Sequence, residues 1–161
     1  PEGALYAERN FLFRISTAEV ELEESDFTSL PDYNRLIASV SGTMRLSHGA
    51  NGSEKLVLPR STVYAFDGGI QTHCVCKARD LNLMLRKGAA EGELVFVDSG
   101  TELNLEPAAN ETMLLFELES GNAALCAGGN ARLRCTANGQ CALFTVRLVG
   151  EAIPDSDNRN G

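Results

Sequence analysis

The chain has 161 residues, 43% of them hydrophobic, which is enough for one domain or two tightly fused halves with a substantial core. Its formal net charge of -8 excludes ready binding to nucleic acid or to anionic membrane surfaces, because both would repel it. No apolar run approaches the roughly 20 residues that span a bilayer, and the given start shows no secretory leader, so we expect a cytoplasmic protein.

Short β-type runs separated by Gly, Asn and Pro follow one another along the whole chain and predict an all-β fold. In the first part, strands are predicted over residues 11–20, 35–40, 43–47, 55–58, 61–66, 71–77 and 80–86. The acidic run over residues 19–26 indicates a solvated bend before Phe27. The glycines at 68 and 69 are expected to supply backbone angles closed to most residues.

After Gly88 the pattern starts again, with strands predicted over residues 94–97, 101–105, 112–118, 123–126, 131–135 and 142–149. An internal echo supports a duplication, since residues 36–46 and 114–125 both have the pattern strand, glycine turn, strand. We therefore expect an N-terminal half over residues 1–88 and a C-terminal half over 89–150. Residues 151–161 have nothing to bury and predict a disordered tail.

The predicted strand at residues 80–86 has two contrasting faces. Side chains alternate across a strand, which separates Asp80, Asn82, Met84 and Arg86 from Leu81, Leu83 and Leu85. The leucines require an apolar layer behind them, while the polar face suits the lining of a cavity. The alternative is an edge strand whose polar side lies in water.

Cysteine and histidine give no support for a metal site. The five cysteines, at positions 74, 76, 126, 135 and 141, lack the C-x-x-C spacing of zinc or redox motifs, and most are expected to be reduced core residues. His73 should point away from the face that Cys74 and Cys76 share. His48 is expected in a hairpin tip, with a surface or supporting role. We expect no metal and no cofactor.

Several motifs occur in the order found in one known family. The phrase Arg79-Asp80-Leu81-Asn82-Leu83-Met84 resembles the Asp-Phe-Asn-x-Met signature of the HutD/Ves family of cupin-like proteins. Residues 13–18 resemble the family's Trp-Arg-Ile-Ser-x-Ala segment, and residues 27–30 resemble its Phe-Ser-x-Phe/Leu turn. Between and after them come Tyr33-Asn34-Arg35, Ser41-Gly42 and Phe66-Asp67-Gly68. The family's usual Trp-rich first strand has no counterpart, so we expect that strand to be missing.

The resemblance implies an all-β, cupin-like double-stranded β-barrel or sandwich with two similar halves, that is, a bicupin. It also implies a non-catalytic protein that binds a small organic acid such as urocanate or formylglutamate and moderates bacterial histidine utilisation. A homodimer remains open.

The candidate ligand-binding residues combine charged, amide and apolar side chains. Arg14 and Arg35 each present a rigid fork of donors that matches a carboxylate. The alternative is that either arginine pairs with Asp80 and satisfies a buried charge, although the resemblance favours a ligand role for Arg35. Asn82 can both donate to and accept from a ligand. The remaining candidates are Asp80, Ser16, Phe27, Met84 and Phe66.

Two other functions remain open from the sequence. One is a metal-free isomerase or hydrolase that uses Asp80 as general acid or base. The other is a structural or protein-interaction module, which would have the Asp80 face filled by side chains.

Overall fold

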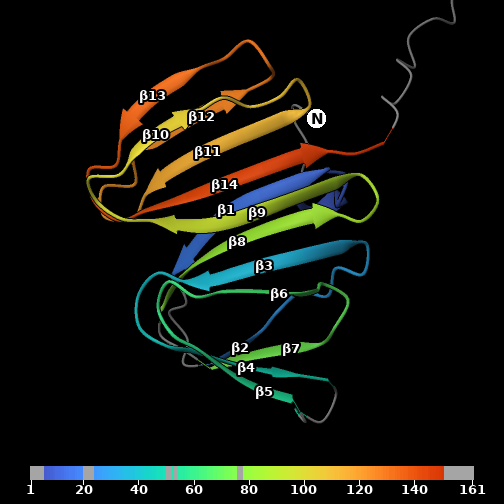
Figure 1. Ribbon diagram of the computed structural model, residues 1–161. Helices are drawn as coiled ribbons and strands as arrows, with labels where there is room; N and C mark the ends of the chain where they lie inside the picture. The colour runs from blue at the N-terminus through green and yellow to red at the C-terminus, as the bar shows by residue number, and fades with distance from the viewer. Residues whose placement is uncertain (1–5, 20–23, 50–51, 53, 76–77, 151–161) are drawn as a thin grey trace, which may run out of the picture.

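The computed structural model describes residues 6–19, 24–49, 52, 54–75 and 78–150, and its strands form four antiparallel sheets stacked in layers (Figure 1). The all-β prediction is confirmed, because the helical structure among the described residues is limited to the short 3-10 helix Tyr6–Glu8. No helix in this described part of the chain is long and apolar enough to cross a membrane.

The first half supplies two four-stranded sheets. The inner N-sheet has the order β1-β8-β3-β6, formed by Phe13–Glu19, Arg79–Arg86, Tyr33–Ser39 and Val63–Asp67. The outer N-sheet has the order β2-β7-β4-β5, formed by Glu24–Asp26, Thr72–Val75, Met44–His48 and Glu54–Leu58.

The second half supplies one four-stranded and one two-stranded sheet. The inner C-sheet has the order β12-β11-β14-β9, formed by Ala123–Ala127, Glu111–Glu117, Cys141–Leu148 and Ala90–Val97. The outer C-sheet pairs β10 with β13, formed by Glu102–Leu105 and Leu133–Thr136.

The two inner sheets share one topology. Taken in chain order, β1, β3, β6 and β8 occupy the same relative places as β9, β11, β12 and β14, with the fourth strand between the first and second. This agreement is consistent with two similar halves, of which the second has no described counterpart of the β4–β5 hairpin. The sequence echo has a different basis, since β11 and β12 form a hairpin whereas β3 and β4 lie in different sheets.

The apolar face of β8 faces the second half, as predicted. Leu81, Leu83 and Leu85 are at most 4% exposed and belong to a central core between the inner sheets, together with Phe144 and Val146 of β14. Burying each leucine side chain contributes about 1.5–3 kcal/mol, so this layer holds the halves together. The opposite face of β8 therefore points toward the outer N-sheet.

Some element boundaries differ from the sequence prediction. Part of the acidic run forms β2, because Asp26 and Glu24 pair in register with β7. The strand β9 begins at Ala90, four residues early by the pattern, because Gly92 lets it lie close to β14: a Cβ at Gly92 would stand 2.6 Å from the Thr145 carbonyl oxygen. Cys76 and the tail at 151–161 lie outside the described residues.

Candidate functional site

A cavity of about 280 Å³ lies against the polar face of the inner N-sheet. It is lined by all but one of the predicted ligand-binding residues, namely Arg14, Ser16, Phe27, Arg35, Asp80, Asn82 and Met84. The side of β8 opposite the leucines is therefore hollowed rather than filled by side chains. The prediction of a lined cavity holds geometrically, and the edge-strand alternative is wrong because β8 lies inside its sheet, between β1 and β3.

Strand register brings these residues together from distant parts of the chain. Met84 of β8 is paired with Arg14 of β1 on one side and with Arg35 of β3 on the other. Two residues further along β8, Asn82 is paired with Ser16. Neighbouring strands lie about 5 Å apart, so two guanidinium-bearing side chains flank one small space.

Arg35 is buried between aromatic rings. Its side chain is 5% exposed, and its guanidinium carbon lies 4.7 Å from the ring centroid of Phe27 and 5.4 Å from that of Phe66. Its Nε donates a hydrogen bond of 3.4 Å to Oδ1 of Asn82. Phe66, the predicted residue that does not line the cavity, thus backs the arginine that does. The rings attract the cation and orient its plane.

Asp80 is a buried acid at the same wall. Its side chain is 6% exposed, and Oδ1 accepts a hydrogen bond of 3.2 Å from the Ala18 backbone amide. Burial raises the pKa of Asp80 above its ordinary value, and this effect exceeds the lowering by the Ala18 amide and by the Arg35 charge.

Arg14 is half-buried at the β1 side of the cavity. Its Nη1 donates a hydrogen bond of 2.8 Å to Oγ of Ser16, two residues along the same face. The expected alternative, in which an arginine pairs with Asp80, is represented by the electrostatic effect of Arg35 on that acid. Ser16 thus orients Arg14 along the cavity wall.

The structure adds two residues that the sequence did not assign to the site, Asp26 and Thr28. Asp26 ends β2 and also accepts a hydrogen bond of 2.8 Å from Nδ1 of His73, whose Nε2 lies 3.6 Å from Glu24. The Asp26 hydrogen bond is the main cause that raises the pKa of His73 above its ordinary value. The place of Asp26 immediately before Phe27 was the available signal.

His48 is buried, and its expected place in a surface hairpin tip is wrong. It is the last residue of β4, 3% exposed, with Nδ1 at 2.9 Å from Thr72 Oγ1 and its ring 5.2 Å from that of Phe66. Its Nε2 has no hydrogen-bond partner among the described residues. The alternation of Met44, Leu46 and His48 on one face could have predicted this burial.

The described cysteines remain free thiols, and Cys74, Cys126 and Cys141 are buried. Cys74 lies inside the N-terminal core, whereas His73 next to it is partly exposed on the other face. Within the described ranges, no three side chains of His, Cys, Asp or Glu gather closely enough to hold a metal ion.

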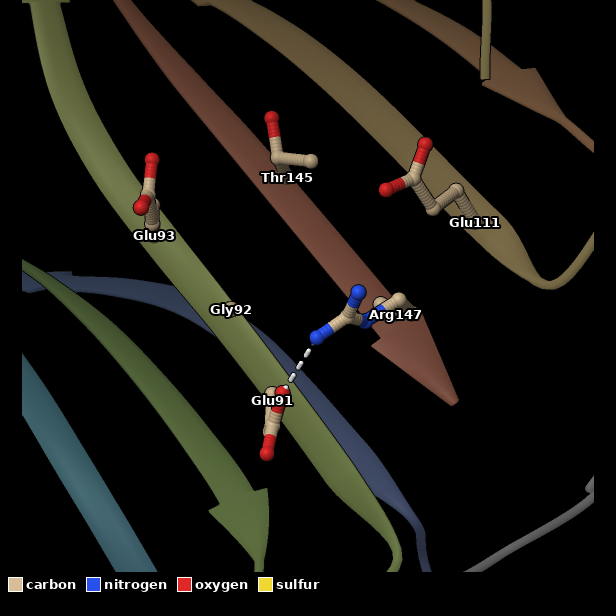
Figure 2. Close-up of a pocket in the computed structure, with 6 residues that line it drawn as sticks. All are labelled: Glu91, Gly92, Glu93, Glu111, Thr145 and Arg147. Carbon is tan, nitrogen blue, oxygen red and sulfur yellow. Dashed lines mark hydrogen bonds and ion pairs between the residues drawn. The ribbon is translucent and has the colours of Figure 1, made fainter. Parts of the chain in front are cut away.

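A second hollow of about 440 Å³ lies on the counterpart strands β9, β11 and β14 (Figure 2). Its lining is acidic and open, formed by Glu91, Gly92, Glu93, Glu111, Thr145 and Arg147. Arg147 Nη2 lies 2.6 Å from a Glu91 carboxylate oxygen, and both side chains are more than half exposed. Its polar groups are therefore already hydrated, unlike the buried groups of the first cavity.

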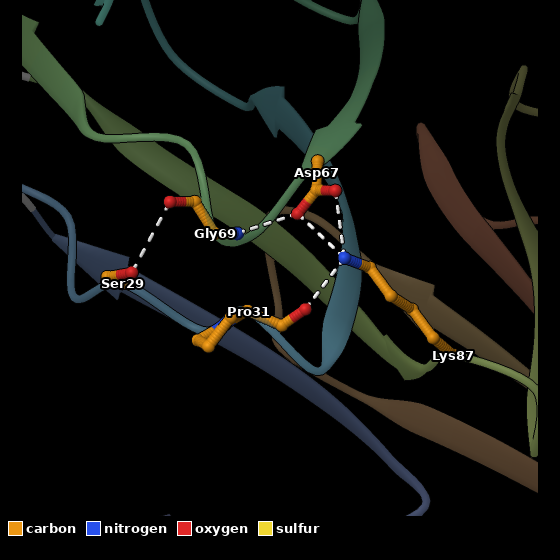
Figure 3. A network of polar contacts seen from close by, with 5 residues as sticks. All are labelled: Ser29, Pro31, Asp67, Gly69 and Lys87. Atoms are coloured by element: carbon orange, nitrogen blue, oxygen red, sulfur yellow. Dashed lines mark hydrogen bonds and ion pairs between the residues drawn. The ribbon is translucent and has the colours of Figure 1, made fainter.

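A polar network fixes the β6–β7 turn behind Arg35 (Figure 3). Lys87 Nζ donates to both carboxylate oxygens of Asp67 at 2.8 Å and to the Pro31 carbonyl at 2.7 Å. Neither Gly68 nor Gly69 has a positive φ, so the expected need for special backbone angles is wrong. Gly68 is required for space instead, since a Cβ there would stand 2.7 Å from the Leu30 carbonyl oxygen.

Comparison with known proteins identifies a family and a fold. The model of the HutD family matches residues 1–147. HutD from Pseudomonas fluorescens SBW25 is 24% identical, with a TM-score of 0.69 over 87% of this chain and 81% of that one. A conserved protein of unknown function from Pseudomonas aeruginosa PAO1 is 25% identical, with a TM-score of 0.66 over 88% of this chain and 85% of that one. No functionally curated protein matches. The family resemblance and the fold class expected from it are confirmed.

Proposed function

The chain belongs to the HutD family, and on that premise we propose that it is a non-catalytic, cytoplasmic protein that binds a small carboxylate metabolite. The ligand we propose is an organic acid of histidine breakdown, urocanate or formylglutamate, and the role is to moderate bacterial histidine utilisation. The observation that carries the proposal is the buried guanidinium of Arg35 at the wall of an enclosed polar cavity.

The chemistry of the cavity supports an anionic ligand. A guanidinium taken out of water loses hydration, so an anion that reaches it gains a strong charge-assisted hydrogen bond. The rings of Phe27 and Phe66 fix the plane of Arg35, which reduces the ordering cost of binding. Asn82 beside it can donate to a ligand oxygen while its own oxygen remains bonded to Arg35.

Calorimetric titration with urocanate and with N-formylglutamate tests the proposal. We expect the wild type to bind at least one of them and Arg35→Gln to weaken that binding about 10- to 100-fold, because a charge-assisted hydrogen bond is lost. Arg147→Gln in the second hollow is the matched control and should leave the affinity unchanged. Circular dichroism confirms that each variant is folded.

Two results contradict the proposal. One is a wild type that binds neither acid. The other is a folded Arg35→Gln variant that binds as tightly as the wild type.

A metal-free enzyme is a second candidate, favoured by one observation. Asp80 is buried beside the cavity with its pKa raised, which is typical of a general acid or base. Turnover of either acid by the wild type that disappears in Asp80→Asn would establish catalysis in place of simple binding.

A further inference from the structure

Asp80 and Arg35 share one cavity of about 280 Å³, and this has a consequence for the ligand that the proposed function supplies. A carboxylate drawn to Arg35 comes to lie near a second carboxyl group that is itself only 6% exposed. Two carboxylates in a space with little water repel strongly unless one of them holds a proton. Binding of an anion here therefore requires a protonated partner or a costly rearrangement.

We propose that the ligand carboxylate binds with Asp80 in its protonated form, so that each ligand takes up one proton from solvent. Oδ1 of Asp80 already accepts the hydrogen bond of the Ala18 amide, so the proton resides on Oδ2. This O–H then donates to the ligand carboxylate, while Arg35 donates to the same anion. No other bond forms or breaks.

The surroundings of Asp80 favour this proton. Burial already opposes the ionised form, and the charge of Arg35 is one of the influences that favour it. A bound anion neutralises Arg35 and adds a negative charge nearby. Both changes raise the pKa of Asp80 further, so ligand and proton bind together.

Other charged groups around Asp80 must be separated from it in a test. Arg14 on β1 and Arg35 on β3 keep their charges through the neutral pH range. Asp26 on β2 lines the same cavity and is hydrogen-bonded to His73 of β7. His73 has a raised pKa and is the neighbour that titrates near neutral pH, so its contribution needs its own variant.

The experiment is calorimetric titration of N-formylglutamate from about pH 5.5 to about pH 8.5, a range in which the ordinary carboxyl groups of this probe stay ionised. Each pH is measured in two buffers with different ionisation enthalpies. We expect the wild type to take up close to one proton per ligand where its affinity falls, and the association constant to decrease by up to about tenfold per pH unit.

Two variants assign the effect. Asp80→Asn keeps a hydrogen-bond donor in the place of the proposed O–H but cannot titrate, so we expect it to bind with an affinity independent of pH. His73→Gln removes the neighbouring titration and should retain the pH dependence of the wild type.

Three outcomes overturn the inference. The first is wild-type binding with no proton uptake across the range, which leaves the carboxylate-binding function intact. The second is an Asp80→Asn variant as pH-dependent as the wild type, and the third is an Asp80→Asn variant that loses binding at about pH 5.5, because the acid would then act in its ionised form. Absence of wild-type binding at the lowest pH also overturns it, and if urocanate fails to bind as well, the proposed function fails with it.

Discussion

At the scale of single residues, the buried imidazole of His48 depends on one hydroxyl group. Thr72, fully buried, donates its hydroxyl hydrogen to the Ile70 carbonyl at 3.1 Å and so accepts from Nδ1–H of His48 at 2.9 Å. The ring in turn packs against Phe66, which backs Arg35. A change at Thr72 therefore acts on the wall of the cavity through His48 and Phe66.

Replacing Thr72 with valine should destabilise the protein by about 1–3 kcal/mol, because the isosteric side chain leaves Nδ1 of His48 buried without a partner. Denaturant unfolding followed by circular dichroism measures the change. Thr72→Ser keeps the hydroxyl and should remain closer to the wild type. A valine variant as stable as the wild type would show that the hydrogen bond contributes nothing.

The site residues on β8 and β3 were predictable, and His48 was not. Strict alternation of polar and apolar residues over 80–86 placed Asp80 and Asn82 on one face, and that physical pattern survives folding. His48 was assigned by its closeness to the Asn51-Gly52 turn signal, although it shares a face with Met44 and Leu46. A polar residue inside a barrel carries no apolar signal, so the pattern underestimates its burial.

At the scale of elements, the short strand β2 is held to β7 by charge. His73 lies between Asp26 and Glu24, and the hydrogen bond from Asp26 is the main cause that raises its pKa. Because its pKa in the folded state lies above that of the unfolded chain, about 6.5, the stabilisation is complete below that value and is lost as pH rises through the folded pKa.

We therefore expect a proton NMR titration of the His73 ring to give a midpoint above about 6.5. Asp26→Asn should lower this midpoint, because the neutral amide no longer stabilises the imidazolium. A wild-type midpoint at or below the ordinary histidine value would contradict the arrangement of β2 against β7.

The strand β2 shows why some elements could not be read from the sequence. Glu24–Asp26 has three residues and no β-branched or aromatic side chain, and its acidic flank favours a loop. Its pairing is specified by His73, some 50 residues later in the chain, a contact that local pattern cannot contain. The strand β8, in contrast, carries its own burial pattern and was placed within one residue at its start.

At the scale of the whole molecule, the leucine face of β8 joins the two halves. Leu83 is fully buried in the core between the inner sheets, where it belongs to the same cluster as Phe144 of the second half. The cavity lies on the other face of this strand, so the second half supports the site from behind. The matching strand orders of the inner sheets explain how one arrangement serves both halves.

Leu83→Ala should destabilise the protein by about 2–5 kcal/mol, since it removes buried contacts and leaves a void between the inner sheets. Because both halves share that core, we expect one cooperative unfolding transition by circular dichroism and by intrinsic tyrosine fluorescence. Val57→Ala, at a side chain 59% exposed, is the matched control and should change stability by no more than about 0.5 kcal/mol. Separate transitions for the two halves would contradict a shared core.

The all-β fold and its cupin-like class could be predicted because turn residues and ordered motifs recur along the chain. The layering was less accessible. Residues such as Gly92 and Gly68 owe their identity to the close approach of carbonyl groups from other strands, Thr145 and Leu30, which only the assembled sheets reveal.

The most direct test of the central claim is a crystal structure of the wild type grown with urocanate or N-formylglutamate. The account predicts electron density for the ligand carboxylate within hydrogen-bonding distance of Arg35, with Asn82 and Asp80 beside it. An empty cavity together with ligand bound in the second hollow at Arg147 would contradict it.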